Sequence, residues 1–327
     1  MGKRHRDGAT DLSFFEGTEK KVELAVHPGQ VSLRSFGHDY WGEVARRAGA
    51  LVLSRISNGH CDAYLLSESS LFVYDEKMIM ITCGRTRLPG AVSFLLERIP
   101  PDGVRFFIYE RKNEVFPHFQ PTHFFDDARA LREYLPGRAF RFGEEDAHHL
   151  YLYHLDRPYT GEPGDVTVEL LMYGLDPAAS RVFRPQAGGR TAALRDSTGV
   201  DRILPGFEVD DHLFQPHGYS LNAIRGREYW TVHVTPEQVS SYASFETNHR
   251  FEESDLESTS NRLLALFRPR AFDLVVFDQR DGEPRLETSY RMKDHFANRL
   301  SCGYRVRFQS FFRPRSDVRQ PYEIPVG

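Results

Sequence analysis

The stretch Tyr64-Leu65-Leu66-Ser67-Glu68-Ser69-Ser70-Leu71-Phe72-Val73 joins two apolar runs through a short polar step. Aliphatic and aromatic residues on both sides of the step favour β-strands, and polar residues between two such runs are typical of a turn. The sequence therefore predicts two antiparallel strands, 63–66 and 70–74, joined by a hairpin that turns at Glu68 and Ser69.

The same pattern continues on both sides of this hairpin. Runs 50–56 and 77–82 are also rich in β-branched or aromatic residues, and turn signals at Asn58-Gly59 and Asp75-Glu76 separate them from the hairpin. The result is a predicted antiparallel meander. Further strands are predicted over 104–109, 149–155, 166–172, 229–235, 241–247, 271–277 and 304–312.

Helical spacing of apolar residues is less frequent. It occurs over 39–47, 91–99 and 126–134, and a capping box from Ser254 to Glu257 predicts a further helix that Pro269 stops. Strands and helices thus alternate in two loosely similar halves. No glycine-rich turn opens a helix after a strand, which argues against a Rossmann fold. We expect an α+β protein, a four-layer αββα sandwich with helices on the outer faces of two antiparallel sheets.

Composition narrows the class of protein. The 327 residues include 42 basic and 46 acidic ones, and a net charge of −4 argues against a nucleic-acid binder. Three cysteines, Cys61, Cys83 and Cys302, suit free thiols in a reducing compartment better than disulfides or a zinc site. No apolar run reaches the roughly 18 residues that span a bilayer. We expect a disordered tail over 1–13, one domain over 14–327, and a cytoplasmic location.

Three separated segments resemble one enzyme family. They are Phe14-Phe15-Glu16-Gly17-Thr18-Glu19-Lys20, the opening stretch continued to Thr82-Cys83-Gly84, and 214–222 continued through 229–248. In this order and at similar separations, they resemble the eukaryotic-type S-adenosylmethionine decarboxylases. The resemblance spans nearly the whole chain, and it rests on the three segments together.

Decarboxylation of an α-amino acid leaves a carbanion, which requires a carbonyl cofactor as electron sink. The resemblance implies that this cofactor is a pyruvoyl group made from Ser69. The Ser69 hydroxyl would attack the carbonyl of Glu68, and cleavage would give a small chain, 1–68, and a large chain, 69–327. The pyruvoyl group would form an imine with S-adenosylmethionine, release carbon dioxide, and supply the aminopropyl donor for spermidine and spermine synthesis.

The resemblance also implies roles for helper residues. His233 would take the Ser69 α-proton during cleavage, Ser220 would steady the ester, and Cys83 would return a proton to the substrate. Glu16 and Glu19 match acidic positions near the active site, and Glu19 is the one tied to processing. Without the resemblance, these residues have ordinary interpretations: a core histidine, a turn serine, a buried thiol and a solvated strand end.

Substrate-binding positions follow from the same comparison. Phe15 and Phe214 match the pair that stacks on adenine, and Glu237 matches the carboxylate that holds the ribose hydroxyls. Leu66 and Glu68 match residues that line the adenine site, partly through their backbone. In a chain with 25 phenylalanines, core packing is the alternative for the two aromatic positions.

A second acidic set raises the question of an activator. Alternation at period two places Asp165, Thr167 and Glu169 on one strand face, and acids that point inward need a cation. With Glu23 and Glu246, they match positions that bind putrescine in animal members of the family. The alternative is a buried network neutralised by Lys or Arg, with Arg111 as a candidate, and both remain open. Ile81 stands where the family commonly has a lysine, and His217 where it often has a cysteine.

Three other functions fit the sequence less well. A pyruvoyl enzyme acting on ornithine or arginine would not need the adenine positions, and an uncleaved pseudoenzyme that activates a partner would not need Ser69 with Cys83, Ser220 and His233. A metal protein built on the 14 histidines lacks convincing ligand spacing. We expect S-adenosylmethionine as the small-molecule partner, with no nucleic acid, membrane or metal. Monomer and homodimer both remain open.

Overall fold

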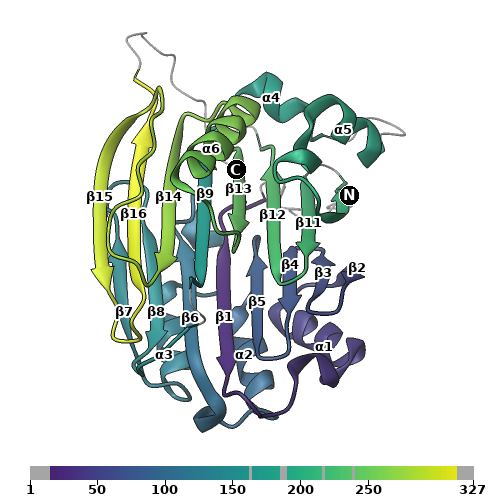
Figure 1. The fold of residues 1–327 in the computed structure, drawn as a ribbon, viewed down its shortest axis with the longest axis vertical. Helices are drawn as coiled ribbons and strands as arrows, with labels where there is room; N and C mark the ends of the chain where they lie inside the picture. Colours follow the sequence, from purple (N-terminus) through teal and green to yellow (C-terminus); the bar gives the residue numbers. More distant parts are fainter. Residues whose placement is uncertain (1–14, 162–163, 185–189, 216–217, 238–239, 315–327) are drawn as a thin grey trace, which may run out of the picture.

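Two eight-stranded antiparallel sheets form the centre of the molecule in the computed structural model, which describes residues 15–161, 164–184, 190–215, 218–237 and 240–314 (Figure 1). The first sheet has the order β2-β3-β4-β5-β1-β6-β8-β7. Its strands are β1 (Lys20–Val26), β2 (Val52–Ser57), β3 (Asp62–Leu66), β4 (Ser69–Val73), β5 (Lys77–Thr82), β6 (Val104–Lys112), β7 (Gly137–Phe142) and β8 (Leu150–Leu155).

The second sheet repeats this topology with every strand number raised by eight, β10-β11-β12-β13-β9-β14-β16-β15. The expectation of two similar halves is therefore confirmed. Its strands are β9 (Val166–Tyr173), β10 (Glu208–Leu213), β11 (Tyr219–Arg225), β12 (Glu228–Thr235), β13 (Tyr242–Thr247), β14 (Ala271–Asp278), β15 (Arg291–Arg299) and β16 (Arg305–Phe312).

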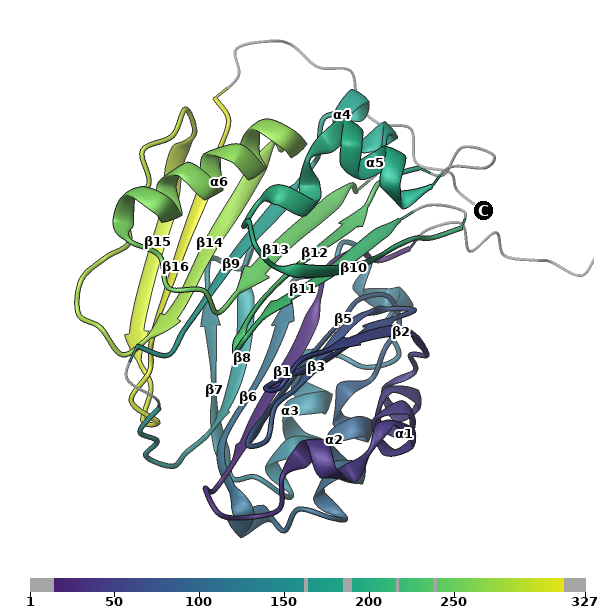
Figure 2. The same ribbon diagram turned by 45° about the vertical axis from the view of Figure 1, so that its right-hand side comes forward.

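Six α-helices among the described residues cover the outer faces of the sheets (Figure 2). The first sheet carries α1 (His38–Ala48), α2 (Leu88–Leu96) and α3 (Phe124–Arg132). The second carries α4 (Pro177–Arg181), α5 (Thr191–Thr198) and α6 (Glu253–Phe267). Two apolar cores lie between helices and sheets, and two further clusters join the sheets face to face. The predicted αββα sandwich is confirmed.

The predicted central hairpin is present, with one adjustment. Ser67 and Glu68 form the two-residue turn, and Ser69 is already the first residue of β4, paired with Leu66. The turn is tied to its neighbour because Ser67 exchanges hydrogen bonds with Leu51: its N–H donates to the Leu51 carbonyl, and its Oγ accepts from the Leu51 N–H. The Glu68–Ser69 bond therefore lies at a fixed corner of the first sheet.

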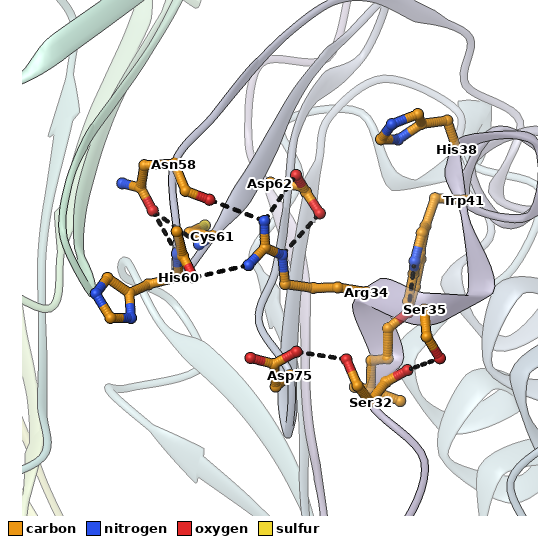
Figure 3. Close-up of polar contacts among 12 residues, drawn as sticks. Ser32, Arg34, Ser35, His38, Trp41, Asn58, His60, Cys61, Asp62 and Asp75 are labelled. Atoms are coloured by element: carbon orange, nitrogen blue, oxygen red, sulfur yellow. Dashed lines mark hydrogen bonds and ion pairs between the residues drawn. The ribbon is translucent and has the colours of Figure 1, made fainter.

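A half-buried arginine, Arg34, anchors the strands that lead to this hairpin (Figure 3). The Arg34 guanidinium binds both carboxylate oxygens of Asp62, at 2.9 and 3.3 Å, and the carbonyl oxygens of Asn58 and Gly59, at 2.8 and 3.0 Å. This bidentate geometry fixes the β2–β3 connection. It therefore sets the register of β3, which ends at Leu66, three residues before Ser69.

Several elements were missed by the sequence prediction. These are β1, β7, β10, β11, β15, α4 and α5. The residues of the edge strands β7, β10 and β15 are mostly exposed or only partly buried, so their sequences carry little apolar signal. The predicted capping box is wrong, because α6 begins at Glu253 with Glu252 as its N-cap and Ser254 lies inside the helix. The expected tail over 1–13, Phe14 and His217 lie outside the described residues.

Candidate active site

Ser69 occupies an unusual backbone position. It is 1% exposed, pairs with Thr82 of β5, and has a φ angle of 127°. Positive φ is sterically unfavourable for a residue with a side chain, and such strain is typically concentrated at functional sites. The peptide bond next to Ser69 is thus held in a conformation that relaxed chains avoid.

Cys83 forms hydrogen bonds with the residues on both sides of the Glu68–Ser69 peptide bond. Its N–H donates to the carbonyl oxygen of Glu68 at 2.9 Å, and its Sγ donates to the same oxygen at 3.4 Å. The Ser69 hydroxyl donates to Cys83 Sγ, also at 3.4 Å. Burial raises the pKa of the Cys83 thiol, so the thiol stays protonated at neutral pH. Two donors thus polarise the Glu68 carbonyl, and the Ser69 hydroxyl lies beside them.

The Glu68 side chain lies in the same buried corner. Burial raises its pKa to about 7, although Lys20 acts to lower it, and Glu68 Oε2 has no hydrogen-bond partner. Lys20 Nζ donates to the Gly84 carbonyl at 2.9 Å and to Gln120 Oε1 at 2.8 Å, and burial lowers its pKa to about 8. Lys20 and Gln120 were not predicted as site residues. The only sequence signal was the place of Lys20 at the end of the first motif.

His233 of β12 lies in a buried polar network between the sheets. Its Nδ1 is 2.9 Å from Ser220 Oγ, and its Nε2 is 2.9 Å from Thr231 Oγ1 and 3.2 Å from Ser70 Oγ. Burial lowers the pKa of His233 to about 3, so the ring is neutral near pH 7 and is a weaker base than a free imidazole. The predicted pair of His233 and Ser220 is brought together. Ser70, Thr231 and Asn222, which hydrogen-bonds Ser70, were not singled out from the sequence.

The two predicted acidic positions near the site are buried, so their interpretation as a solvated strand end is wrong. Glu16 Oε2 accepts the backbone N–H groups of Val115 and Phe116 at 3.0 and 3.2 Å, which ties the N-terminal segment to that loop. Glu19 accepts the Ser244 hydroxyl at 2.7 Å and so joins the two sheets. Burial raises the pKa of Glu19 to about 7.

The structure brings some of the predicted substrate-binding residues close together. The N–H of Phe15 donates to Glu237 Oε1 at 3.1 Å, which brings the N-terminal segment to the end of β12. The Phe15 ring is 36% exposed, and a Cβ on Gly84 would lie 2.9 Å from it and 2.7 Å from Glu68 Oε2. Phe214 is half-buried, with its ring against His212. Leu66 packs its side chain into the core beneath the helices, so only its backbone is left to face the site.

The second acidic set is a buried row between the sheets. Lys21 Nζ lies 2.8 Å from Glu169, 3.1 Å from Glu246 and 3.6 Å from Glu110. Lys112 contacts Glu169 at 3.0 Å. At the other end, a third lysine, Lys77, lies 3.3 Å from Glu23 and 3.7 Å from Asp165, and the set includes buried Thr167.

The charges in this row are coupled. Burial would lower the pKa of Lys21, but Glu169 and Glu246 raise it well above its ordinary value. The two lysines Lys112 and Lys21 hold the pKa of Glu169 at about 2 against the effect of burial. Burial raises the pKa of Glu246 to about 8. The row therefore keeps its lysines charged and retains protons on part of its carboxyl groups.

Arg111 was the wrong candidate for the partner of these acids. Its guanidinium binds Asp127 at 2.7 Å and Glu114 at 2.5 Å, on the opposite side of β6 from Glu110 and Lys112. Ile81 packs in an apolar cluster between the sheets, and its cross-strand neighbour on β1 is Lys21. A buried lysine therefore lies directly across the ladder from position 81.

Two further features bear on the class of protein. Among the described residues, no helix is both long and apolar enough to span a bilayer. The same residues contain no group of three or more His, Cys, Asp or Glu side chains placed to hold a metal ion.

Comparison with known proteins identifies the family. A family model described as adenosylmethionine decarboxylase matches residues 12–312. The S-adenosylmethionine decarboxylase proenzyme of Leishmania donovani is 35% identical, over 89% of this chain and 84% of the relative. The proenzyme of Xenopus laevis is 33% identical, over 86% and 88%. The solved structure of the Trypanosoma brucei AdoMetDC-delta26 monomer is 27% identical, with a TM-score of 0.59, over 75% of this chain and 99% of that one. The chain belongs to the adenosylmethionine decarboxylase family.

Proposed function

We propose that this chain is an S-adenosylmethionine decarboxylase that makes its own pyruvoyl group by breaking the bond between Glu68 and Ser69. The observation that carries the proposal is the pair of hydrogen bonds from Cys83 to the Glu68 carbonyl oxygen, beside a Ser69 held at a φ of 127°. A polarised carbonyl, an adjacent hydroxyl and a strained backbone together favour attack on the chain's own amide.

Cleavage would proceed in two steps. First, Ser69 Oγ attacks the Glu68 carbonyl carbon, the C–N bond breaks, and the amide becomes an ester with a free amino group on Ser69. The N–H and thiol of Cys83 stabilise the negative charge that develops on the carbonyl oxygen. This step relieves the backbone strain at Ser69, because the Glu68 chain is then attached through the flexible side chain.

The second step is an elimination. A base removes the Ser69 α-proton, the Cβ–Oγ bond breaks, and Glu68 leaves as a carboxylate. We assign His233 as the base by its position, since its neutral ring is hydrogen-bonded to Ser220 and lies 3.2 Å from the hydroxyl of Ser70, the residue next to Ser69. Hydrolysis of the remaining dehydroalanine releases ammonia and leaves a pyruvoyl group at residue 69.

The residues present fit such a group. The start of β4 is buried against Cys83, whose thiol is 3.4 Å from Ser69 Oγ and stays protonated. When formed, the pyruvoyl carbonyl supplies an electron sink for the substrate amine. Cys83 then holds a proton for the substrate Cα, while Phe15 and Glu237, joined by a hydrogen bond, offer a ring face and a carboxylate to a nucleoside. Three buried, unpaired cysteines support a reducing compartment, the cytoplasm.

We also propose that the chain's own lysines replace a diamine activator. Lys21 and Lys77 place two ammonium groups at the two ends of the acidic row, where they contact Glu169, Glu246, Glu23 and Asp165. The cavity next to Lys77, of about 260 Å³, is lined by Arg105, Arg227 and Arg250 and by the acids Glu76, Asp165 and Glu228. With Lys77, the basic groups outnumber the acidic ones, so the cavity offers a free dication no net negative charge. Added putrescine should therefore change the activity of the purified protein little.

The test is a mass measurement on the purified protein. Two chains, 1–68 and 69–327, with a pyruvoyl mass at the start of the larger one, are expected, and the Ser69→Ala variant should stay intact. An intact wild-type chain would contradict the proposal and favour a pseudoenzyme. Carbon dioxide release from S-adenosylmethionine, and not from ornithine or arginine, tests the substrate separately.

A further inference from the structure

The network around His233 contains enough donors and acceptors to decide which ring nitrogen carries the proton. Ring protons are assigned from hydrogen-bond logic, and here that logic begins at a backbone carbonyl. Asn222 Nδ2 donates to the Tyr64 carbonyl oxygen at 3.0 Å. Because a carbonyl can only accept, the Asn222 amide has one orientation, and its Oδ1 faces Ser70 and Thr231.

The orientation of Asn222 directs the neighbouring hydroxyl groups. Ser70 Oγ lies 2.5 Å from Asn222 Oδ1, which has no proton, so Ser70 donates to Asn222. Thr231 Oγ1 donates to the Leu221 carbonyl at 2.8 Å. Each hydroxyl has a single proton, and both are spent on these oxygens. Toward His233, Ser70 and Thr231 can therefore only accept.

It follows that His233 Nε2 carries the proton and shares it between Thr231 and Ser70. Nδ1 is then bare and accepts from Ser220 Oγ at 2.9 Å. With the opposite tautomer, the hydroxyl of Ser220, which is 4% exposed, would have no acceptor among the described residues, and Thr231 would lose its bond to Leu221. A buried donor without an acceptor is destabilising, so the first arrangement is favoured.

We propose that Asn222 and Thr231 are positioning residues that hold His233 as the Nε2–H tautomer, which makes Nδ1, on the Ser220 side, the nitrogen that takes the proton during self-cleavage. This inference rests on the proposed function for its role in the reaction. The proton leaves Ser69 Cα and arrives at Nδ1, directly or across the Ser220 hydroxyl, while the Cβ–Oγ electrons leave with the Glu68 carboxylate. The ring then carries both protons, and its Nε2–H bonds to Thr231 and Ser70 are unchanged.

The carbonyl group that orients Asn222 belongs to a different cleavage fragment from His233. Tyr64 lies in the predicted small chain, whereas Asn222, Thr231 and His233 lie in the predicted large chain. The residues whose groups set the tautomer are all buried where the two sheets meet: Tyr64, Ser70, Leu221, Asn222 and Thr231. The network therefore assembles only when β3 and β4 have docked against β11 and β12, so the base becomes competent only in a folded chain.

The experiment compares Thr231→Val, which keeps the shape and removes the hydroxyl, with Thr231→Ser, which keeps the hydroxyl. The tautomer is read by ¹⁵N NMR of the His233 ring in the uncleavable Ser69→Ala background. We expect Nε2–H in the parent and in Thr231→Ser, and a mixture of the two tautomers in Thr231→Val, because Ser70, at 3.2 Å, is then the one acceptor left for Nε2–H among the described residues. In the cleavable chain, Thr231→Val should slow cleavage at least about tenfold, because loss of one buried hydrogen bond is worth about 1.4 kcal/mol, and Thr231→Ser should restore most of the rate.

A second measurement identifies the step. If the slowed step is proton removal, Thr231→Val accumulates the ester, which hydroxylamine cuts to leave a hydroxamate on Glu68 and an unmodified serine at 69. Nδ1–H in the parent, or wild-type cleavage by Thr231→Val with an unchanged ring spectrum, would overturn the inference. A wild-type chain that never cleaves would defeat the proposed function alone, since the NMR result still decides the tautomer. Thermal melting shows whether each variant is folded.

Discussion

Cys83 donates twice to one oxygen, the carbonyl of Glu68: its N–H at 2.9 Å and its thiol at 3.4 Å. The backbone donor cannot be removed by mutation, but the thiol can. Cys83→Ala should therefore still cleave, about tenfold more slowly if the thiol contributes one hydrogen bond of about 1.4 kcal/mol. Decarboxylation by the cleaved protein should fall much further, because the proton donor is lost. Gel electrophoresis measures the rate of cleavage, and carbon dioxide release measures the rate of decarboxylation. Equal losses in the two rates would contradict separate roles for the thiol in the two reactions. Cys83→Ser, which retains a donor, is the control.

Lys21 is fully buried and contacts Glu169, Glu246 and Glu110. Lys21→Met should destabilise the protein by about 3–5 kcal/mol, because removing one partner leaves buried charges unpaired. Urea unfolding measures this loss. If the lysine replaces a diamine, putrescine should restore stability and activity to the variant while changing the parent little. Lys293→Met, at a half-exposed lysine that forms an ion pair with Asp294, should change neither. Strong activation of the parent by putrescine would contradict the proposal.

Gly84 lies where Phe15 and Glu68 meet, with a φ of 63°. Gly84→Ala should push the Phe15 ring away and raise KM for S-adenosylmethionine more than it lowers kcat. Gly226 is a matched control, since it has a φ of 57° and no atom lies within 4 Å of the position that a Cβ would take there. Gly226→Ala should show only the backbone cost, about 1 kcal/mol. Equal KM values for the two variants would argue against a substrate role for this corner.

The depressed pKa of His233, about 3, has a consequence for acid stability. Between pH 6.5 and 3, the unfolded chain binds a proton on this residue that the folded chain does not, so the free energy of unfolding falls as the pH falls. The slope is at most about 1.4 kcal/mol per pH unit. Glu19 and Glu246, whose pKa values are raised by burial, act in the opposite sense, with stability falling as the pH rises toward 7 or 8.

A comparison of variants isolates the histidine from these carboxyl groups. His233→Gln in the uncleavable Ser69→Ala background should flatten the loss of stability below pH 6.5, as followed by urea unfolding at several pH values. The slope near neutral pH should not change. Parallel curves for the variant and its parent would show that His233 does not titrate as proposed.

The fold class and the paired site residues could be read from the sequence because they depend on local signals: apolar runs for the central strands, and short motifs that hold Cys83, Ser220 and His233. The basic residues that pair with the acidic row could not be predicted from the sequence. The sequence suggested Arg111 as a candidate, but the register places Lys21 opposite Glu110, and strand alternation turns Arg111 to the other face of β6. β1 itself was missed because its lysines and glutamate are buried against charges that lie far away in the sequence.

The position of β1 determines how the two fragments of the proposed cleavage stay together. β1 belongs to the predicted small chain, yet it lies between β5 and β6, which belong to the predicted large chain. The small chain also contains β3, which pairs with β4 of the large chain. After the cut, the small fragment cannot leave unless three ladders of the first sheet separate: β3–β4, β1–β5 and β1–β6. The mature enzyme would therefore be held together by its unfolding barrier, and a molecule that unfolded would have to find its other half again. Self-cleavage would convert a protein that can refold into one whose lifetime is set by kinetics.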